Sequence, residues 1–143
     1  MVELQIVDVE MGNGHGDVYC QDMDGFYYKF PVEYSKAKFI SLLMHGVYVP
    51  SNGIYELMLK LLNSIGLSVD AIIVLDGYEN KAAIRVINSN SEPKFLPINI
   101  EDGLVLGVLA DAPFYIKREA AFLEVETIED SLWYRLLKEL DLC

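Results

Sequence analysis

The stretch from Asn52 to Leu75 constrains the fold most, because it predicts a helix that runs directly into a buried strand. Its apolar residues recur at steps of three and four, as on one helix face: Ile54, Leu57, Met58, Leu61, Leu62 and Ile65. Ser51 or Asn52 can cap the start of this helix, and Gly66 suits a left-handed cap at its end. The continuous run Ala71–Leu75 indicates a strand covered on both faces. We therefore expect a core of helix and strand in which the helix buries its apolar face.

The remaining elements predict an α+β fold. Strands are expected at Val2–Glu10 (with a bulge near Ile6-Val7), Asp17–Asp22, Phe26–Val32, Ala82–Asn88, Lys94–Ile98 and Pro113–Ile116. Further helices are expected at Ser35–His45, Asp102–Ala110 and, with an amphipathic pattern, Ser131–Leu140. Met23-Asp24-Gly25 predicts a hairpin turn, and Asn88–Pro93 predicts a polar loop. We expect one compact domain over residues 1–118, a mixed sheet with about three helices, and a carboxy-terminal extension over residues 119–143.

The helix expected at Asp102–Ala110 is apolar nearly all round, which predicts deep burial. Asn99 is placed to cap its start, and Asp102 lies three positions later, close to a capping-box arrangement. Gly103 and Gly107 lie one turn apart within it, although each glycine costs a helix interior about 1 kcal/mol. This pair predicts a neighbouring element packed very close to the helix.

Charge and composition exclude several classes of protein. The formal net charge of −11 opposes general nucleic-acid binding, because such a chain repels phosphate backbones. No apolar run approaches the roughly 20 residues that span a bilayer, and the first residues lack the positive charge of a signal peptide. Cys20 and Cys143 are the only cysteines, which fits a reducing compartment. We expect a soluble cytoplasmic protein. Its 52% hydrophobic content predicts strands buried on both faces or a surface that meets a partner subunit.

Three local patterns favour structural over functional roles. The glycine-rich segment Gly12–Gly16 lacks the Gly-Lys-Ser/Thr of a phosphate loop, so it predicts a hairpin loop. The aromatic residues of Phe26–Phe30 are accompanied by a single lysine, which favours packing or an interface over base stacking. His15 and His45 form no ligand motif, so no zinc site is expected, and His45 suits the end of a helix.

Two stretches together resemble the bifunctional nuclease domain family, long catalogued as a domain of unknown function. The first comprises Phe30-Pro31-Val32, the helix after it and a segment that runs ungapped from Gly46 to Leu75. The second comprises Asp102, its apolar helix and Ala112–Ile116. The resemblance extends over roughly residues 2–116 and rests on the order and spacing of these elements. It implies the fold of that family and metal-dependent hydrolysis of phosphodiesters.

The polar signatures of that family are partly retained. Its Thr-His-Asp-Leu corresponds here to Ile54-Tyr55-Glu56-Leu57, which keeps the acid and loses the hydroxyl and the histidine. Its Arg-Pro-Ser-Asp-Ala corresponds to Asn99–Gly103, which keeps only Asp102 and loses the arginine, a natural phosphate clamp. The resemblance thus points to Glu56 and Asp102 as the positions at which its chemistry would reside.

Glu56 and Asp102 are the candidate catalytic and metal-binding residues. Each falls in the first turn of a predicted helix, so if the two starts converge the pair can hold one Mg²⁺ or Mn²⁺. Glu101 and Asp76 are possible supplements, and no organic cofactor is expected. The plain alternative is that both are ordinary acids at helix starts, with Glu56 on the solvent side beside Lys60.

Two functions therefore remain open. One is a divergent metal-dependent nuclease. The other is a noncatalytic acidic, oligomeric module that binds a protein or a small ligand, which the lost histidine and arginine and the negative charge favour. In either case we expect a homo-oligomer, most simply a two-fold dimer, because the apolar content and the predicted Trp133-bearing helix need a surface to cover.

Overall fold

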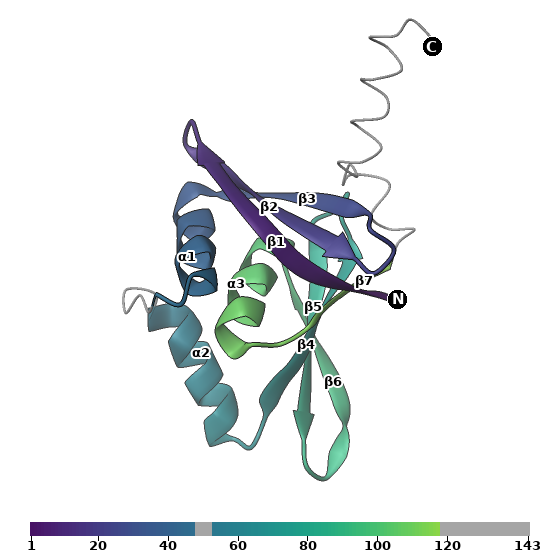
Figure 1. Ribbon diagram of the computed structural model, residues 1–143. Helices are drawn as coiled ribbons and strands as arrows, with labels where there is room; N and C mark the ends of the chain where they lie inside the picture. The colour runs from purple at the N-terminus through teal and green to yellow at the C-terminus, as the bar shows by residue number, and fades with distance from the viewer. Residues whose placement is uncertain (48–52, 118–143) are drawn as a thin grey trace, which may run out of the picture.

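The computed structural model describes residues 1–47 and 53–117, which form a single α+β domain (Figure 1). It contains a mixed sheet of seven strands: β1 (Val2–Gly12), β2 (His15–Asp22), β3 (Tyr27–Glu33), β4 (Ser68–Asp76), β5 (Lys81–Asn88), β6 (Ser91–Ile98) and β7 (Phe114–Ile116). Its three helices are α1 (Tyr34–Met44), α2 (Gly53–Ser64) and α3 (Ile100–Ala110). No helix within these ranges is long and apolar enough to span a membrane.

The sheet runs in the order β3-β2-β1-β7-β4-β5-β6. Only β4 and β7 pair in parallel, and the other neighbours are antiparallel. The helix α3 contacts both β3, at one edge of this order, and β5, next to the other edge. The sheet therefore curves around α3, which lies between the two groups of strands, while α1 and α2 follow one another along the outer side of α3 (Figure 1).

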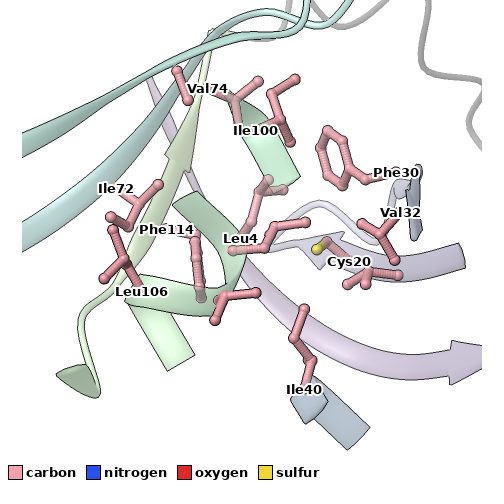
Figure 2. Close-up of a cluster of buried hydrophobic side chains, with 14 of the residues drawn as sticks. Leu4, Cys20, Phe30, Val32, Ile40, Ile72, Val74, Ile100, Leu106 and Phe114 are labelled. Carbon is pink, nitrogen blue, oxygen red and sulfur yellow. The ribbon is translucent and has the colours of Figure 1, made fainter. Parts of the chain in front are cut away.

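The hydrophobic core surrounds α3. Figure 2 shows side chains from β1, β2 and β3 facing side chains from β4 and β7 around this helix. The fully buried members of the cluster include Val18, Cys20, Tyr28, Phe30, Ile40, Ile72, Val74, Leu104, Val105, Leu106 and Ile116. Because strands enclose α3 and α1 covers it, an apolar residue is accommodated at almost every position, as the sequence predicted.

The predicted close neighbour of α3 is the strand pair β4 and β7. A Cβ added at Gly107 would meet the ring of Phe114 and lie 2.9 Å from Cγ1 of Ile72. At Gly103 the added carbon would lie 3.2 Å from Cγ2 of Ile72. The predicted cap is also confirmed, since Oδ1 of Asn99 accepts the backbone N–H of Asp102 at 2.7 Å.

Most predicted strands and turns are confirmed. The register of β1 against β2 shifts between Ile6 and Asp8, where the bulge was expected. A tight turn connects β2 to β3. Positive φ angles at Gly46 and Gly66 allow the left-handed ends of α1 and α2. The β4 segment Ala71–Val74 is buried on both faces as predicted, whereas Leu75, the last residue of the predicted buried run, is 39% exposed.

The prediction that α2 buries its apolar face is wrong. Ile54, Leu57, Met58, Leu61 and Ile65, which we call the α2 stripe, are between 39% and 71% exposed, and α2 has no buried residue. The helix packs on α3 and β4 through a neighbouring strip, with Tyr55, Leu59 and Leu62 partly buried against the core. The periodicity identified an apolar face correctly, but most of that face points away from the core.

The polar run after β5 also differs from its prediction. Strand β6 begins at Ser91, and Asn88 pairs with Ser91, so the expected loop Asn88–Pro93 is a tight hairpin. Asn88 shortens the connection by accepting the backbone N–H of Asn90 on its side chain at 3.0 Å. The Ser51 or Asn52 cap, the Ser131–Leu140 helix, the extension 119–143 and Cys143 lie outside the described residues.

Candidate functional site

The first turns of all three helices meet in one group of polar side chains, which we call the helix-start junction. It consists of Lys36 from α1, Tyr55 from α2, and Asn99, Glu101 and Asp102 from the start of α3. The two acids lie at the positive end of the α3 dipole, which stabilises carboxylates. The junction therefore unites three helix starts that are far apart in the sequence.

Asp102 lies at the centre of the junction. Its Oδ1 accepts the hydroxyl of Tyr55 at 2.6 Å and lies 3.2 Å from Nζ of Lys36. Its Oδ2 accepts the side-chain amide of Asn99 at 2.9 Å. Burial alone would raise the pKa of Asp102, but the hydrogen bonds from Tyr55, Asn99 and Lys36 outweigh burial and lower it below its usual value. Asp102 is thus held as a carboxylate at neutral pH.

Glu101 connects α3 to the start of α1. Its Oε2 lies 3.1 Å from Nζ of Lys36, and its Oε1 accepts the backbone N–H of Glu33, the residue that precedes α1. Lys36 lies 3.9 Å from the carboxylate of Glu33 as well. Partial burial opposes the charge of Lys36, yet the hydrogen bonds to Glu101 and Asp102 raise its pKa above the usual range. Lys36 therefore remains a cation shared by these acids.

Glu56 lies in the first turn of α2, beside Tyr55, and it is half-buried rather than on the solvent side. One of its carboxylate oxygens is withdrawn from solvent. The hydrogen bond that joins the first turns of α2 and α3 is made by Tyr55. The helix starts converge as the sequence analysis required, whereas the catalytic and metal-binding roles of Glu56 and Asp102 stay predictions.

The remaining polar candidates lie elsewhere. Asp76 accepts the backbone N–H groups of Tyr78 and Glu79 at 2.9 and 3.2 Å, so it shapes the turn between β4 and β5. His45 ends α1, with its ring Nδ1 2.7 Å from the carbonyl oxygen of Ser41. His15 begins β2. Of the supplements considered, only Glu101 belongs to the junction.

The sequence analysis did not identify Lys36 and Tyr55 as site residues. Lys36 is 65 positions from Glu101, and no local pattern links them. The only signal for Tyr55 came from the predicted resemblance, which relates it to a histidine of the family's first signature. A polar side chain at that position could have been predicted to contact Asp102.

A divalent metal does not fit the junction as it is arranged. Both oxygens of Glu101 and both oxygens of Asp102 already accept protein donors. The ammonium of Lys36, at 3.1 and 3.2 Å from the two carboxylates, occupies the place between them that a bridging cation would take. Mg²⁺ would need these oxygens at about 2 Å in near-octahedral geometry. Lys36 therefore supplies the positive charge that the acids require.

Two cavities lined by described residues lie away from the junction. One, of about 480 Å³, lies between the start of β1 and the ends of α1 and α3, and Leu43, Met44 and Val108 help line it. The other, of about 410 Å³, lies beside the end of α2, near Leu67 and Ile87. No junction residue lines either cavity.

Raising the pH should weaken the junction. Burial and the hydrogen bond to Asp102 raise the pKa of Tyr55 from 10.0 to about 12. Because this folded-state pKa is raised, the stability contributed by Tyr55 is complete below pH 10 and is lost as the pH rises through 12. Tyr55→Phe should cost about 1 kcal/mol at neutral pH, since the bonded carboxylate is charged but partly exposed.

The measurement is urea unfolding of wild type and Tyr55→Phe at neutral pH and between pH 10 and 12. The difference between the two proteins should shrink across the alkaline range. Tyr19→Phe is the control variant. The pKa of Tyr19 is also raised to about 12, but its hydroxyl donates to Glu10 on β1 and not to the junction. An unchanged difference at all pH values would show that the Tyr55 hydroxyl contributes no such stability.

Tyr55 and Asp102 share a hydrogen bond. The predicted resemblance to the bifunctional nuclease domain family would relate Tyr55 to the histidine of its first signature and Asp102 to the aspartate of its second. Among the described residues, no three histidine, cysteine or acidic side chains gather as a metal-binding group. The resemblance itself stays a prediction, because no family model matches the chain and no significant match occurs among curated proteins.

Proposed function

We propose that this protein is a noncatalytic binding module and that the α2 stripe is its binding surface. The observation that carries the proposal is the exposure of four large apolar side chains on α2 and of Ile65 directly after it. Contiguous exposed apolar surface of this kind normally marks an interaction site. The helix-start junction supports the same function, because it anchors Tyr55 at the start of α2 and so presents the helix rigidly.

The partner that fits this surface is an amphipathic helix. The stripe follows one side of a single helix of 12 residues, at steps of one, three and four positions. A second helix with the same spacing can interleave its side chains with such a row. Nucleic acid is disfavoured, because the chain carries a net charge of −11 and the last turn of α2 has no basic residue.

We also propose that the module is a cytoplasmic homo-oligomer, most simply a two-fold dimer. The buried free thiol of Cys20 suits a reducing compartment. Phe95 and Leu96 on the edge strand β6 are exposed in addition to the α2 stripe, and they offer a second apolar contact for another copy. Light scattering at micromolar concentration that returned the 16.2 kDa of one chain would contradict the dimer.

A second candidate is weak metal-dependent hydrolysis of phosphodiesters at Glu56 and Asp102. It is favoured by the convergence of three helix starts on one place that also contains a cation, Lys36. Helix starts and a lysine are groups that bind phosphate. Against it, the cation is already neutralised by Glu101 and Asp102, and Glu33 adds a further negative charge. No hydrolytic step is therefore derived for this arrangement.

A nuclease assay separates the two candidates. Purified full-length protein is incubated with single-stranded DNA or RNA in Mg²⁺ or Mn²⁺ and, in parallel, with chelator. We expect no cleavage that requires both the metal and the two acids. The matched variants are Glu56→Gln and Asp102→Asn, with Asp111→Asn, an exposed acid at the end of α3, as the control. Cleavage that chelator abolishes, that both variants lose and that Asp111→Asn retains would overturn the noncatalytic proposal.

A further inference from the structure

The larger cavity lies at the ends of α1 and α3 opposite to the helix-start junction, and its volume is about 480 Å³. Its walls come from the start of β1, the last turns of α1 and α3, and the segment that leads into β7. Cavities that hold small molecules in proteins commonly measure about 300–1,000 Å³. The described residues that line this cavity include none from α2, so it is separate from the α2 stripe. The cavity is therefore large enough for a small organic ligand.

The floor of the cavity is apolar. Leu4, Ala112 and Phe114 line it and are at most 9% exposed. Leu43 and Val108, which are partly buried against the core, add aliphatic walls. Because contact between apolar groups removes them from water, such a floor favours a ligand with a hydrocarbon body.

The rim of the cavity is acidic. Glu3 from β1 and Asp111 at the end of α3 both line it and are both exposed. Gln5 adds a neutral polar side chain. The described lining contains no lysine or arginine, so no basic side chain of the lining offsets the two carboxylates. The rim therefore attracts positive charge.

Two helix ends add to this negative field. Leu43 and Met44 belong to the last turn of α1, and Val108 belongs to the last turn of α3. The carboxyl end of a helix carries a partial negative charge, which cations stabilise. Neither last turn contains a basic residue. His45, which follows α1, places its ring Nδ1 2.7 Å from the carbonyl oxygen of Ser41 and is not part of the described lining.

We infer that this cavity binds a small organic amine, an apolar body that carries one ammonium group. The hydrocarbon part contacts the floor formed with Leu4 and Phe114, and the ammonium lies at the rim with Glu3 and Asp111. At the other ends of the same two helices, Lys36 already offsets the acids of the helix-start junction, whereas the described lining here contains no such cation. The inference goes beyond the proposed function, because it assigns a second site that does not involve α2.

The test compares probes that share one apolar body and differ in charge. Phenethylamine is a cation at neutral pH, phenethyl alcohol is neutral and hydrocinnamate is an anion. Each is titrated into full-length protein, and backbone amide shifts are followed by nuclear magnetic resonance. We expect the amine to shift the amides of Glu3, Val108 and Ala112 and to bind roughly tenfold more tightly than the alcohol, since each exposed charge contact changes affinity by about two- to fivefold. The anion should bind most weakly, and high salt should reduce the preference for the amine.

Two variants each remove one carboxylate from the rim. Glu3→Gln and Asp111→Asn should each weaken binding of the amine by about two- to fivefold and leave binding of the alcohol unchanged. Asparagine suits the left-handed backbone of Asp111, whose φ is 53°, so the end of α3 is retained. Glu92→Gln is the matched control, because it removes the same charge from an exposed acid on β6 that does not line the cavity. Its affinity for the amine should equal that of wild type.

Val108→Phe tests the cavity independently of charge. The larger side chain would occupy the cavity, so the shifts caused by the amine and by the alcohol should both disappear while circular dichroism shows a folded protein. Equal affinities of wild type for the three probes would overturn the inference, and so would a loss of affinity in Glu92→Gln as large as in the rim variants. Shifts confined to residues outside the cavity lining, or no shifts with millimolar amine, would overturn it as well.

Discussion

Leu106→Ala is expected to lower the free energy of unfolding by about 2–5 kcal/mol, as truncation of fully buried leucines does. Leu106 is 0% exposed and lies in the middle of α3, around which the sheet curves. Its side chain lies beside Ile72 of β4 and Phe114 of β7 in the buried cluster (Figure 2), and such a close-packed core cannot collapse easily into the space that the side chain leaves. Equilibrium unfolding in urea measures the loss.

Met23→Ala is the matched control for the buried leucine. Met23 is 90% exposed in the turn between β2 and β3, so its truncation should change the free energy of unfolding by less than about 0.5 kcal/mol. Equal losses for the two variants would mean that α3 is not the centre of the core. A loss below about 1 kcal/mol for Leu106→Ala would lead to the same conclusion.

Gly107→Ala is expected to destabilise the protein by about 2 kcal/mol, although alanine normally stabilises a helix interior. The new methyl group would meet the ring of Phe114 and lie 2.9 Å from Ile72, both of which are held in the core. Overpacking of this kind typically costs 1–3 kcal/mol or more, which exceeds the gain of about 1 kcal/mol in helix propensity.

Gly53→Ala provides the comparison for Gly107→Ala. It is also a helical glycine, in α2, but nothing lies within 4 Å of the added carbon. Its substitution should be neutral or slightly stabilising in thermal or urea unfolding. A stabilising effect at Gly107 as well would contradict the close contact between α3, β4 and β7.

The sequence predicted α3 and β4 well because their signals are local and agree with one another. The cap at Asn99 and the two glycines all describe one buried helix, and the β-branched run at β4 describes one buried strand. Each of these features depends on residues within a few positions, so no knowledge of distant partners was needed.

The α2 stripe shows what such signals leave open. Periodicity reports that a helix has an apolar face, but it does not report what covers that face. Here α2 rests on the domain through Tyr55, Leu59 and Leu62, and the neighbouring residues Leu57 and Leu61 remain outside. A helix that serves an interface has the same pattern as one that serves the core.

The helix-start junction could be predicted only in part. Asp102 was proposed from the family resemblance and from its place in the first turn of a predicted helix, and Glu101 was named only as a possible supplement without a signal of its own. Lys36 reaches them from a separate helix, and only the curvature of the fold brings it within 3.2 Å. Its presence changes the expected chemistry, because it neutralises the oxygens that a metal would need.

The central claim is that the α2 stripe is covered by an apolar helix in solution. The most direct measurement is the relaxation of methyl groups by a soluble paramagnetic probe in full-length protein. The methyl groups of Leu61 and Ile65 should be shielded nearly as well as those of Leu106, while the 90%-exposed Met23 relaxes strongly. Relaxation of Leu61 and Ile65 as strong as that of Met23 would show that the stripe faces water, and it would contradict the claim.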